Sequence, residues 1–274
     1  MKKIILAFTS TNFPEAAFDF ALKLNELQPV LLIGAFLPQT LLANLWSYAT
    51  PGGEFSIPLI EPEESMLVQQ NIKRFEKLCK QNGIDYRVHK DFYDLGLIAL
   101  EKESGFADLL MLGSEEFYSN NGQTEADDFL AQALHDAKCP VLVVPKHFIF
   151  PKNIILSYDG NDESIFAIKQ FAYLFPELLN LPALLVYATK NNADNFPEKD
   201  NIEELAKEHF KNLSFHKLVA HSKEYFNTWS MENDRPIVVG GSYGRSGLSQ
   251  LFKKSFMREV IADHHMPVFI AHHK

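Results

Sequence analysis

The fold is decided by the stretch Pro236-Ile237-Val238-Val239-Gly240-Gly241-Ser242-Tyr243-Gly244-Arg245-Ser246-Gly247. Its apolar beginning predicts a buried strand, and its glycines predict a loop in which the main chain can approach a ligand closely. A helix-like segment, Phe256 to His264, and a second apolar run, Pro267-Val268-Phe269-Ile270-Ala271, follow. Strand, glycine loop, helix and strand in this order are typical of α/β domains that bind phosphate through N–H groups at a helix N-terminus.

The same order of features occurs earlier in the chain. Three landmarks are each found twice: Lys3 to Phe8 and Asn153 to Tyr158, Asp108 to Ser114 and Pro236 to Ser242, and Cys139 to Val144 and Met266 to Ala271. They predict a tandem repeat of one domain, with units 1–147 and 151–274. We expect separate five-stranded domains related by a pseudo-twofold axis, because a fused pair can reproduce the contact of a twofold homodimer.

Short apolar runs alternate with helical patterns in each half, which predicts an α/β fold: two tandem doubly wound domains, each a five-stranded parallel sheet with helices on both faces. The expected strands are 3–8, 30–35, 85–91, 108–112 and 141–145, then 153–158, 183–188, 213–219, 236–240 and 267–271. The expected helices include 13–27, 66–79, 162–177, 201–211, 222–232 and 255–264. Ligands of such sheets bind at the carboxyl ends of strands where the strand order reverses. The glycine loop and the turn Asp159-Gly160-Asn161 are expected at that edge.

Composition narrows the function classes. A net charge of −9 argues against nucleic acid as a partner, because phosphate backbones demand clustered Lys and Arg. Cys79 and Cys139 form no metal-ligand spacing or disulfide framework and suit a reducing cytoplasm. Cys79 lies on the apolar side of a predicted helix and is expected in the core. Met1 to Phe8 is expected to be a strand and not a signal peptide, and no run of about 18 apolar residues predicts a membrane span.

The glycine spacing carries a family resemblance. The loop contains Gly241, two residues, Gly244, nine residues and then Lys254-Ser255. This spacing resembles the nucleotide-binding signature of the universal stress protein family, whose loop reads Gly, two residues, Gly, nine residues, Gly, and Ser or Thr. The resemblance implies an adenine nucleotide alpha hydrolase-like fold and a two-domain, tandem member. Lys254 departs from the pattern, because the family has a glycine there.

The resemblance implies a site for ATP or a related adenine nucleotide, with Mg²⁺ accompanying ATP, in the second half only. Asp159 would bind the adenine, Val186 or Tyr187 would meet the base or ribose through its backbone, and Ser255 would meet phosphate. The full set of implied binding residues is Ser157, Asp159, Gly160, Val186, Tyr187, Gly240, Gly241, Gly244, Lys254, Ser255 and Phe256. The alternative for Asp159 is an Asx-turn before Gly160.

Two interpretations of Lys254 stay open. Its Cβ and long side chain can block the approach of the loop to a phosphate. Alternatively, its ammonium group can replace the lost glycine contact with a direct charge. Lys253 and Lys254 precede a predicted helix N-terminus, where cations are unfavourable by about 0.3–1 kcal/mol unless an anion is bound there. We favour the charge, and a nucleotide or another phosphate-bearing ligand.

The first half lacks these features. Thr9 occupies the position of Asp159, and Gly113 is followed by Ser114-Glu115-Glu116 with no second glycine. Two carboxylates would repel a phosphate placed there. We interpret the first half as a degenerate copy that acts as a built-in dimerisation partner, and a homodimer of the whole chain stays open.

No catalytic or metal site is indicated. The pairs His264-His265 and His272-His273 diverge on a helix or strand, and Asp263 is the only carboxylate beside them. The segment 38–65 is either a flap on its own domain or a partner surface. The preferred function is a cytoplasmic universal stress protein that binds or senses an adenine nucleotide in the stress response. The alternatives are a scaffold that acts through protein–protein contacts without a ligand, and a nucleotide hydrolase, for which no general base stands out.

Overall fold

The structure is a computed structural model that describes residues 1–8, 12–37, 62–90, 96–114, 133–189, 195–219, 236–241 and 266–273. The first half contains β1 (Lys2–Phe8), α1 (Glu15–Leu27), β2 (Val30–Phe36), α3 (Pro62–Gln81), β3 (Asp85–Lys90), α4 (Gly96–Ser104), β4 (Leu109–Gly113) and β5 (Val141–Val144). The second half contains β6 (Asn153–Tyr158), α7 (Asp162–Leu174), the 3₁₀ helix η1 (Pro176–Leu178), β7 (Pro182–Thr189), α8 (Lys199–His209), β8 (Asn212–Val219), β9 (Pro236–Gly240) and β10 (Val268–Ile270).

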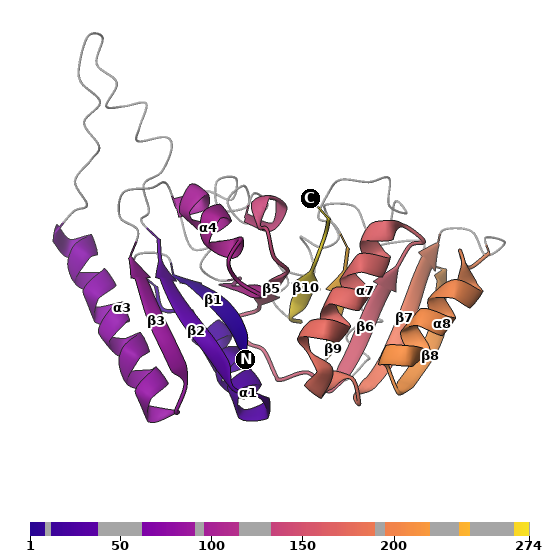
Figure 1. Ribbon diagram of the computed structural model, residues 1–274, viewed down its shortest axis with the longest axis horizontal. Helices are drawn as coiled ribbons and strands as arrows, with labels where there is room; N and C mark the ends of the chain where they lie inside the picture. The colour runs from indigo at the N-terminus through magenta and orange to yellow at the C-terminus, as the bar shows by residue number, and fades with distance from the viewer. Residues whose placement is uncertain are drawn as a thin grey trace, which may run out of the picture.

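The described strands form one ten-stranded sheet in the order β3-β2-β1-β4-β5-β10-β9-β6-β7-β8 (Figure 1). Each half supplies five parallel strands, and the order of the second half is that of the first reversed. The predicted α/β fold with a doubly wound parallel sheet in each half is therefore confirmed. All ten predicted strands are present, with ends shifted by no more than a residue or two.

The expectation of separate sheets is wrong, because the two halves join edge to edge. β5 and β10 pair antiparallel, with Val268 opposite Val143, Phe269 opposite Leu142 and Ile270 opposite Val141. In the aligned repeats Phe269 corresponds to Leu142, so the pseudo-twofold axis passes between these two residues. Each strand would otherwise expose a row of unpaired main-chain groups, and the pairing satisfies them. The domain limits 1–147 and 151–274 stay a prediction.

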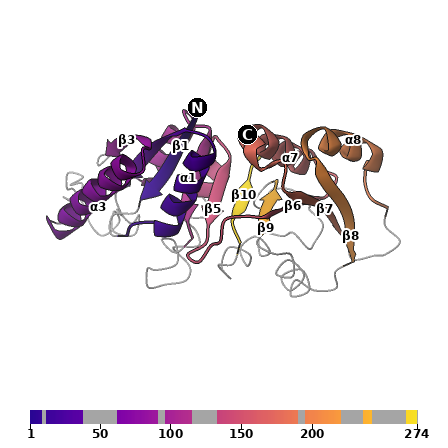
Figure 2. The ribbon, with the colours of Figure 1, turned by 90° about the horizontal axis from the view of Figure 1, so that it is seen from below.

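Among the described residues, helices lie on both faces of the sheet. Figure 2 shows α1, α3, α7 and α8 on one side, where their apolar residues form a core that we call the front core. On the other side α4 and residues 133–137 contribute to a second core, the back core. The helical faces follow the spacing expected from the sequence, and Cys79 of α3 is fully buried, as predicted.

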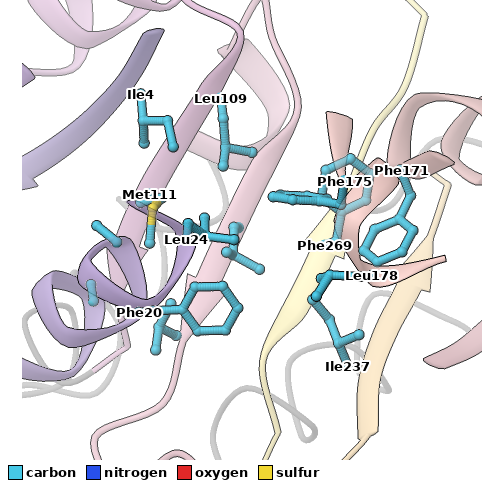
Figure 3. Close-up of a cluster of buried hydrophobic side chains, with 14 of the residues drawn as sticks. Ile4, Phe20, Leu24, Leu109, Met111, Phe171, Phe175, Leu178, Ile237 and Phe269 are labelled. Atoms are coloured by element: carbon cyan, nitrogen blue, oxygen red, sulfur yellow. The ribbon is translucent and has the colours of Figure 1, made fainter. Parts of the chain in front are cut away.

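The front core runs without interruption from one half into the other. Figure 3 shows Phe20 and Leu24 of α1 on one side of it, and Phe171 of α7 and Phe269 of β10 on the other. Phe20 also contacts the connection between the halves, with its ring centroid 5.4 Å from that of Phe148. The halves therefore share their largest apolar cluster.

An ion pair adds a polar contact between the halves. Lys2 of β1 pairs with Glu177 of η1, and both side chains are only 12% exposed. The Lys2 ammonium also lies 5.4 Å from the centre of the Phe175 ring, a distance at which a cation is attracted by the ring face. Because both charged groups are largely removed from water, loss of either one would leave the other unpaired and would destabilise the fold.

Some helix boundaries differ from the prediction. α3 begins at Pro62, inside the segment 38–65 that was expected to be irregular, and proline is favourable at a first helical position, where its N–H is not needed. The predicted helix 162–177 ends at Leu174, and a 3₁₀ turn starts at Pro176, which cannot donate the hydrogen bond that would continue the helix. The predicted helices 222–232 and 255–264 lie outside the described residues.

In the described ranges, no helix is both long enough and apolar enough to cross a membrane.

Candidate functional site

The order of the strands reverses between β6 and β9. From β6 the chain continues to β7 and β8 on one side, whereas β9 and β10 lie on the other. β6 and β9 are parallel neighbours, with Leu156 opposite Val239. The carboxyl ends of these strands therefore lie at the edge where doubly wound sheets bind ligands. Asp159 follows the first of them and Gly241 the second, as the sequence predicted.

Asp159 forms a local turn. One carboxylate oxygen accepts the main-chain N–H of Asn161 at 3.0 Å, and the other accepts the side-chain amide of Asn161 at 2.8 Å. This is the Asx-turn that the sequence offered as the alternative to ligand binding. The Asp159 carboxylate can still accept hydrogen bonds from a ligand, because each of its oxygens can accept more than one.

Gly160 is a glycine for a structural reason. Its φ is +84°, a region that residues with a Cβ rarely occupy. A Cβ at this position would also lie 2.7 Å from Cβ of Pro197. The sequence identified Gly160 as a binding residue, but the spacing gave no sign of the contact with Pro197.

Gly241 lies against the start of α7. An added Cβ would be 2.7 Å from the carbonyl carbon of Glu163 and 2.8 Å from the amide nitrogen of Ser164. Close packing of main chain on main chain thus requires glycine here, independently of any ligand. The preceding residue, Gly240, is buried, and its carbonyl accepts the N–H of Ala271 at 3.2 Å.

Ser157 and Val186 lie opposite each other on β6 and β7, and Tyr187 lies opposite Tyr158. Val186 is fully buried in the back core, so the alternation of side chains puts Ser157 on that face as well. The Ser157 hydroxyl is buried and has no hydrogen-bond partner among the described residues. Such a group is uncommon in proteins, and a partner from outside the described residues would satisfy it.

Phe196 and Phe215, which the sequence analysis did not identify, pack on the opposite face of these strand ends. The ring of Phe196 stacks on Tyr158 with centroids 5.6 Å apart, and it contacts Tyr187 at 5.3 Å and Phe215 at 6.1 Å. Burial, and then the nearby carboxylates of Glu198 and Asp159, raises the pKa of Tyr158 above its ordinary value. The Tyr158 hydroxyl therefore stays protonated and can donate.

The remaining predicted binding residues are not placed. Gly244, Lys254, Ser255 and Phe256 lie outside the described residues, as do Thr9, Glu115 and Glu116 of the first half. In the first half, Gly113 ends β4 opposite Val144, and Ser114 after it is fully buried.

The histidines near the carboxyl end of β10 have structural contacts. The ring of His272 lies 3.2 Å from the carbonyl of His135, which joins the two halves. The main-chain N–H of His273 donates to Glu163 at 2.9 Å, and its ring packs on Phe166. Within the described ranges no group of three or more His, Cys, Asp or Glu side chains is arranged to hold a metal ion.

Comparison with known proteins finds a similar universal stress protein. The sequence is 27% identical over 177 residues to the Universal stress protein Slr1230 of Synechocystis sp.. The chain is a homologue of the universal stress proteins. The match covers 63% of this chain and 60% of that relative, so it spans less than two thirds of the relative's length. No protein-family model matches the sequence.

Solved structures of universal stress proteins share the fold of this homologue. A universal stress protein from Archaeoglobus fulgidus superposes with a TM-score of 0.68 at 12% identity, and the match covers 99% of this chain and 96% of that one. A putative universal stress protein from Pseudomonas aeruginosa gives a TM-score of 0.52 at 13% identity and covers 99% and 93%. Both matches cover nearly the whole chain and show a shared fold.

Proposed function

We propose that this universal stress protein homologue binds an adenine nucleotide, such as ATP, at the carboxyl ends of β6, β7 and β9 in its second half. Binding or sensing, without turnover, would be its role in a cytoplasmic stress response. The first half would serve as the fixed partner of a pseudo-dimer. Mg²⁺ would accompany ATP through the phosphate oxygens, which this ion prefers as ligands.

One observation carries the proposal. Asp159 and Gly241 follow neighbouring strands on the two sides of the point at which the strand order reverses. Two residues before Asp159, the buried hydroxyl of Ser157 lacks a partner among the described residues. An adenine and its ribose offer both donors and acceptors, so they could occupy both groups.

The carboxylates near the start of α7 indicate which end of the nucleotide lies there. Asp159, Asp162 and Glu163 surround the start of α7, and their carboxylates would repel a phosphate at that helix N-terminus. The base is therefore assigned to the Asp159 end. The phosphates are assigned to the part of the glycine loop beyond Gly241, toward Lys254 and Ser255 in the sequence.

Calorimetric titration of the full chain with ATP, ADP and AMP tests the proposal. Asp159→Ala should weaken binding by about 0.5–3 kcal/mol, which is a factor between about 2 and 150, because a buried base donor loses its acceptor. Thr9→Ala is the matched change in the first half and should leave the affinity unchanged. Equal losses in the two variants would contradict a site confined to the second half.

Lys254 gives a second test of the same site. Lys254→Gly should lower the affinity for ATP if the ammonium group contacts a phosphate, and the loss should shrink at high salt as exposed charges are screened. Tighter binding by Lys254→Gly would instead show that the lysine blocks the loop. Titrations at two salt concentrations separate these outcomes.

A second candidate is a scaffold that acts through protein–protein contacts and binds no nucleotide. It is favoured by the Asx-turn, in which both Asp159 oxygens already have a partner in Asn161. Absence of heat and of thermal stabilisation with every nucleotide would favour it. Release of phosphate from ATP above the rate of the Asp159→Ala variant would contradict both candidates and indicate a hydrolase.

A further inference from the structure

Both chain neighbours of Asp159 contact a single distant residue, Pro197. This inference rests on the function proposed above, because it concerns how the proposed base-binding carboxylate is held. Tyr158 precedes Asp159 and Gly160 follows it, and Pro197 lies 39 residues beyond Tyr158 in the chain. The Asx-turn to Asn161 is the local support of the carboxylate, and the contacts with Pro197 are a second support from outside the turn.

The contact with Tyr158 is a hydrogen bond donated by a buried residue. The hydroxyl donates to the carbonyl oxygen of Pro197 at 3.1 Å, and the side chain is only 1% exposed. A buried donor without an acceptor is unfavourable, so this bond holds the end of β6 to the segment that contains Pro197. The stacking of Phe196 on the Tyr158 ring strengthens the same attachment.

Gly160 contacts Pro197 through close packing. A Cβ at Gly160 would lie 2.7 Å from Cβ and 3.1 Å from Cγ of Pro197, so the pyrrolidine ring packs directly on the glycine. Glycine can adopt a wider range of φ and ψ than other residues, and Gly160 is left-handed with φ +84°. The Pro197 ring restricts the range open to Gly160 from one side.

Pro197 is itself fixed by its neighbours. Its ring restricts its own φ. Glu198 has a left-handed backbone, with φ 42° and ψ 41°, and its carboxylate accepts the side-chain amide of Asn201 at 2.8 Å, at the start of α8. Phe196 is held by Tyr187 and by Phe215. A segment restrained by its own contacts therefore packs against the turn.

We propose that Pro197 is a positioning residue for Asp159, which fixes the direction in which the carboxylate meets the base of a bound adenine nucleotide. A hydrogen-bonding group contributes fully only when it is held near the productive geometry before the ligand arrives. Tyr158 and Gly160 transmit the restraint, one through a hydrogen bond and the other through packing. Pro197 makes no contact with the ligand in this role.

Binding of AMP to the full chain tests the inference. Tyr158→Phe removes the hydroxyl and Pro197→Ala removes the ring, and each should weaken AMP binding by about two- to tenfold, the range expected for one net hydrogen bond. Tyr173→Phe is the matched control, because it removes the same atom from a side chain that is 61% exposed near the far end of α7. In an Asp159→Ala background the two changes should have no further effect. A loss that persists in that background would overturn the positioning role.

Hydrogen exchange gives a measurement that needs no ligand. The main-chain N–H of Asn161 donates to Asp159 at 3.0 Å, so its exchange rate reports how firmly the turn is held. Tyr158→Phe and Pro197→Ala should speed this exchange by about two- to tenfold, and Tyr173→Phe should not. Unchanged exchange in both variants overturns the inference whatever the protein binds.

The two measurements also separate this inference from the proposed function. Faster exchange with unchanged AMP affinity would overturn the role of Pro197 toward the base while leaving the nucleotide site intact. Faster exchange in a protein whose wild-type form binds no nucleotide would refute the proposed function and the role toward the base together, and would leave only the support of the turn.

Discussion

Removing the ring of Phe269 is expected to destabilise both halves of the protein at once. Phe269 lies at the centre of β10, opposite Leu142 of β5, and is fully buried. Its ring centroid is 5.3 Å from that of Phe171 and 5.8 Å from that of Phe175. Phe269 thus lies on the strand that pairs with the sheet of the first half, and its ring packs on aromatic residues of its own half.

The magnitude follows from this burial. Truncation of a buried phenylalanine to alanine costs about 3–5 kcal/mol, and truncation of a buried leucine about 2–5 kcal/mol. Phe269→Ala should therefore lower the free energy of unfolding by about 4 kcal/mol, and Leu142→Ala by about 3 kcal/mol. Because the two residues face each other, the double variant should depart from the sum by about 0.5–3 kcal/mol.

Urea unfolding followed by circular dichroism measures the loss, and hydrogen exchange in β1 and β6 shows whether the halves unfold together. A single transition is expected, in which both strands lose protection at the same urea concentration. Phe106→Ala is the control, because that ring is 73% exposed and its removal should change stability by no more than about 0.5 kcal/mol. Unfolding of β6 while β1 stays protected would refute the argument that the shared core makes one cooperative unit.

Three further predictions rest on single contacts. Gly241→Ala should lower the melting temperature, because the added Cβ would lie 2.7 Å from the main chain of α7. Gly105→Ala is the control and should be tolerated better, since its Cβ would meet only a lysine side-chain carbon at 3.3 Å; equal melting temperatures for the two variants would contradict the close packing at Gly241. Lys2→Met should lower the free energy of unfolding in urea by up to about 3–5 kcal/mol, because it leaves the Glu177 carboxylate, only 12% exposed, without its partner. Replacing Glu177 by leucine in the same chain should recover most of the loss, and no recovery would count against a charge effect. Burial raises the pKa of the Cys79 thiol to about 12 from an ordinary value of 9.0. A disulfide reagent at pH 8 should therefore label Cys79 only after unfolding, and rapid labelling of the folded chain would contradict the burial. The contribution of Cys79 to the free energy of unfolding should fall by about 1.4 kcal/mol per pH unit as the pH rises from about 9 toward 12.

The sequence predicted the strands well because their patterns are local. The run 153–158 and β6 have the same ends, and the repeated landmarks placed the first and last strands of each half. The joining of the halves into one sheet was not predicted, because the pairing of β5 with β10 depends on which exposed edges meet. No periodicity within either strand carries that information.

The same distinction applies to the site. Topology alone was enough to bring Asp159 and Gly241 to neighbouring strand ends. The contact of Pro197 with Tyr158 and Gly160 joins segments far apart in the sequence, and it depends on how the segment before α8 folds back over β6. The glycines at 160 and 241 were assigned to ligand approach, whereas their immediate neighbours in the structure are a proline ring and the main chain of α7.

The pairing of Leu142 with Phe269 has a consequence for how this protein could diverge. In a symmetric dimer of identical chains, a residue on the twofold axis faces its own copy, so every substitution there occurs twice. Two leucines leave space on the axis and two phenylalanines compete for it, whereas a fused chain can set one of each against the other. Gene fusion thus removes the requirement for self-complementarity at the axis, and each half becomes free to change without a matching change in its counterpart.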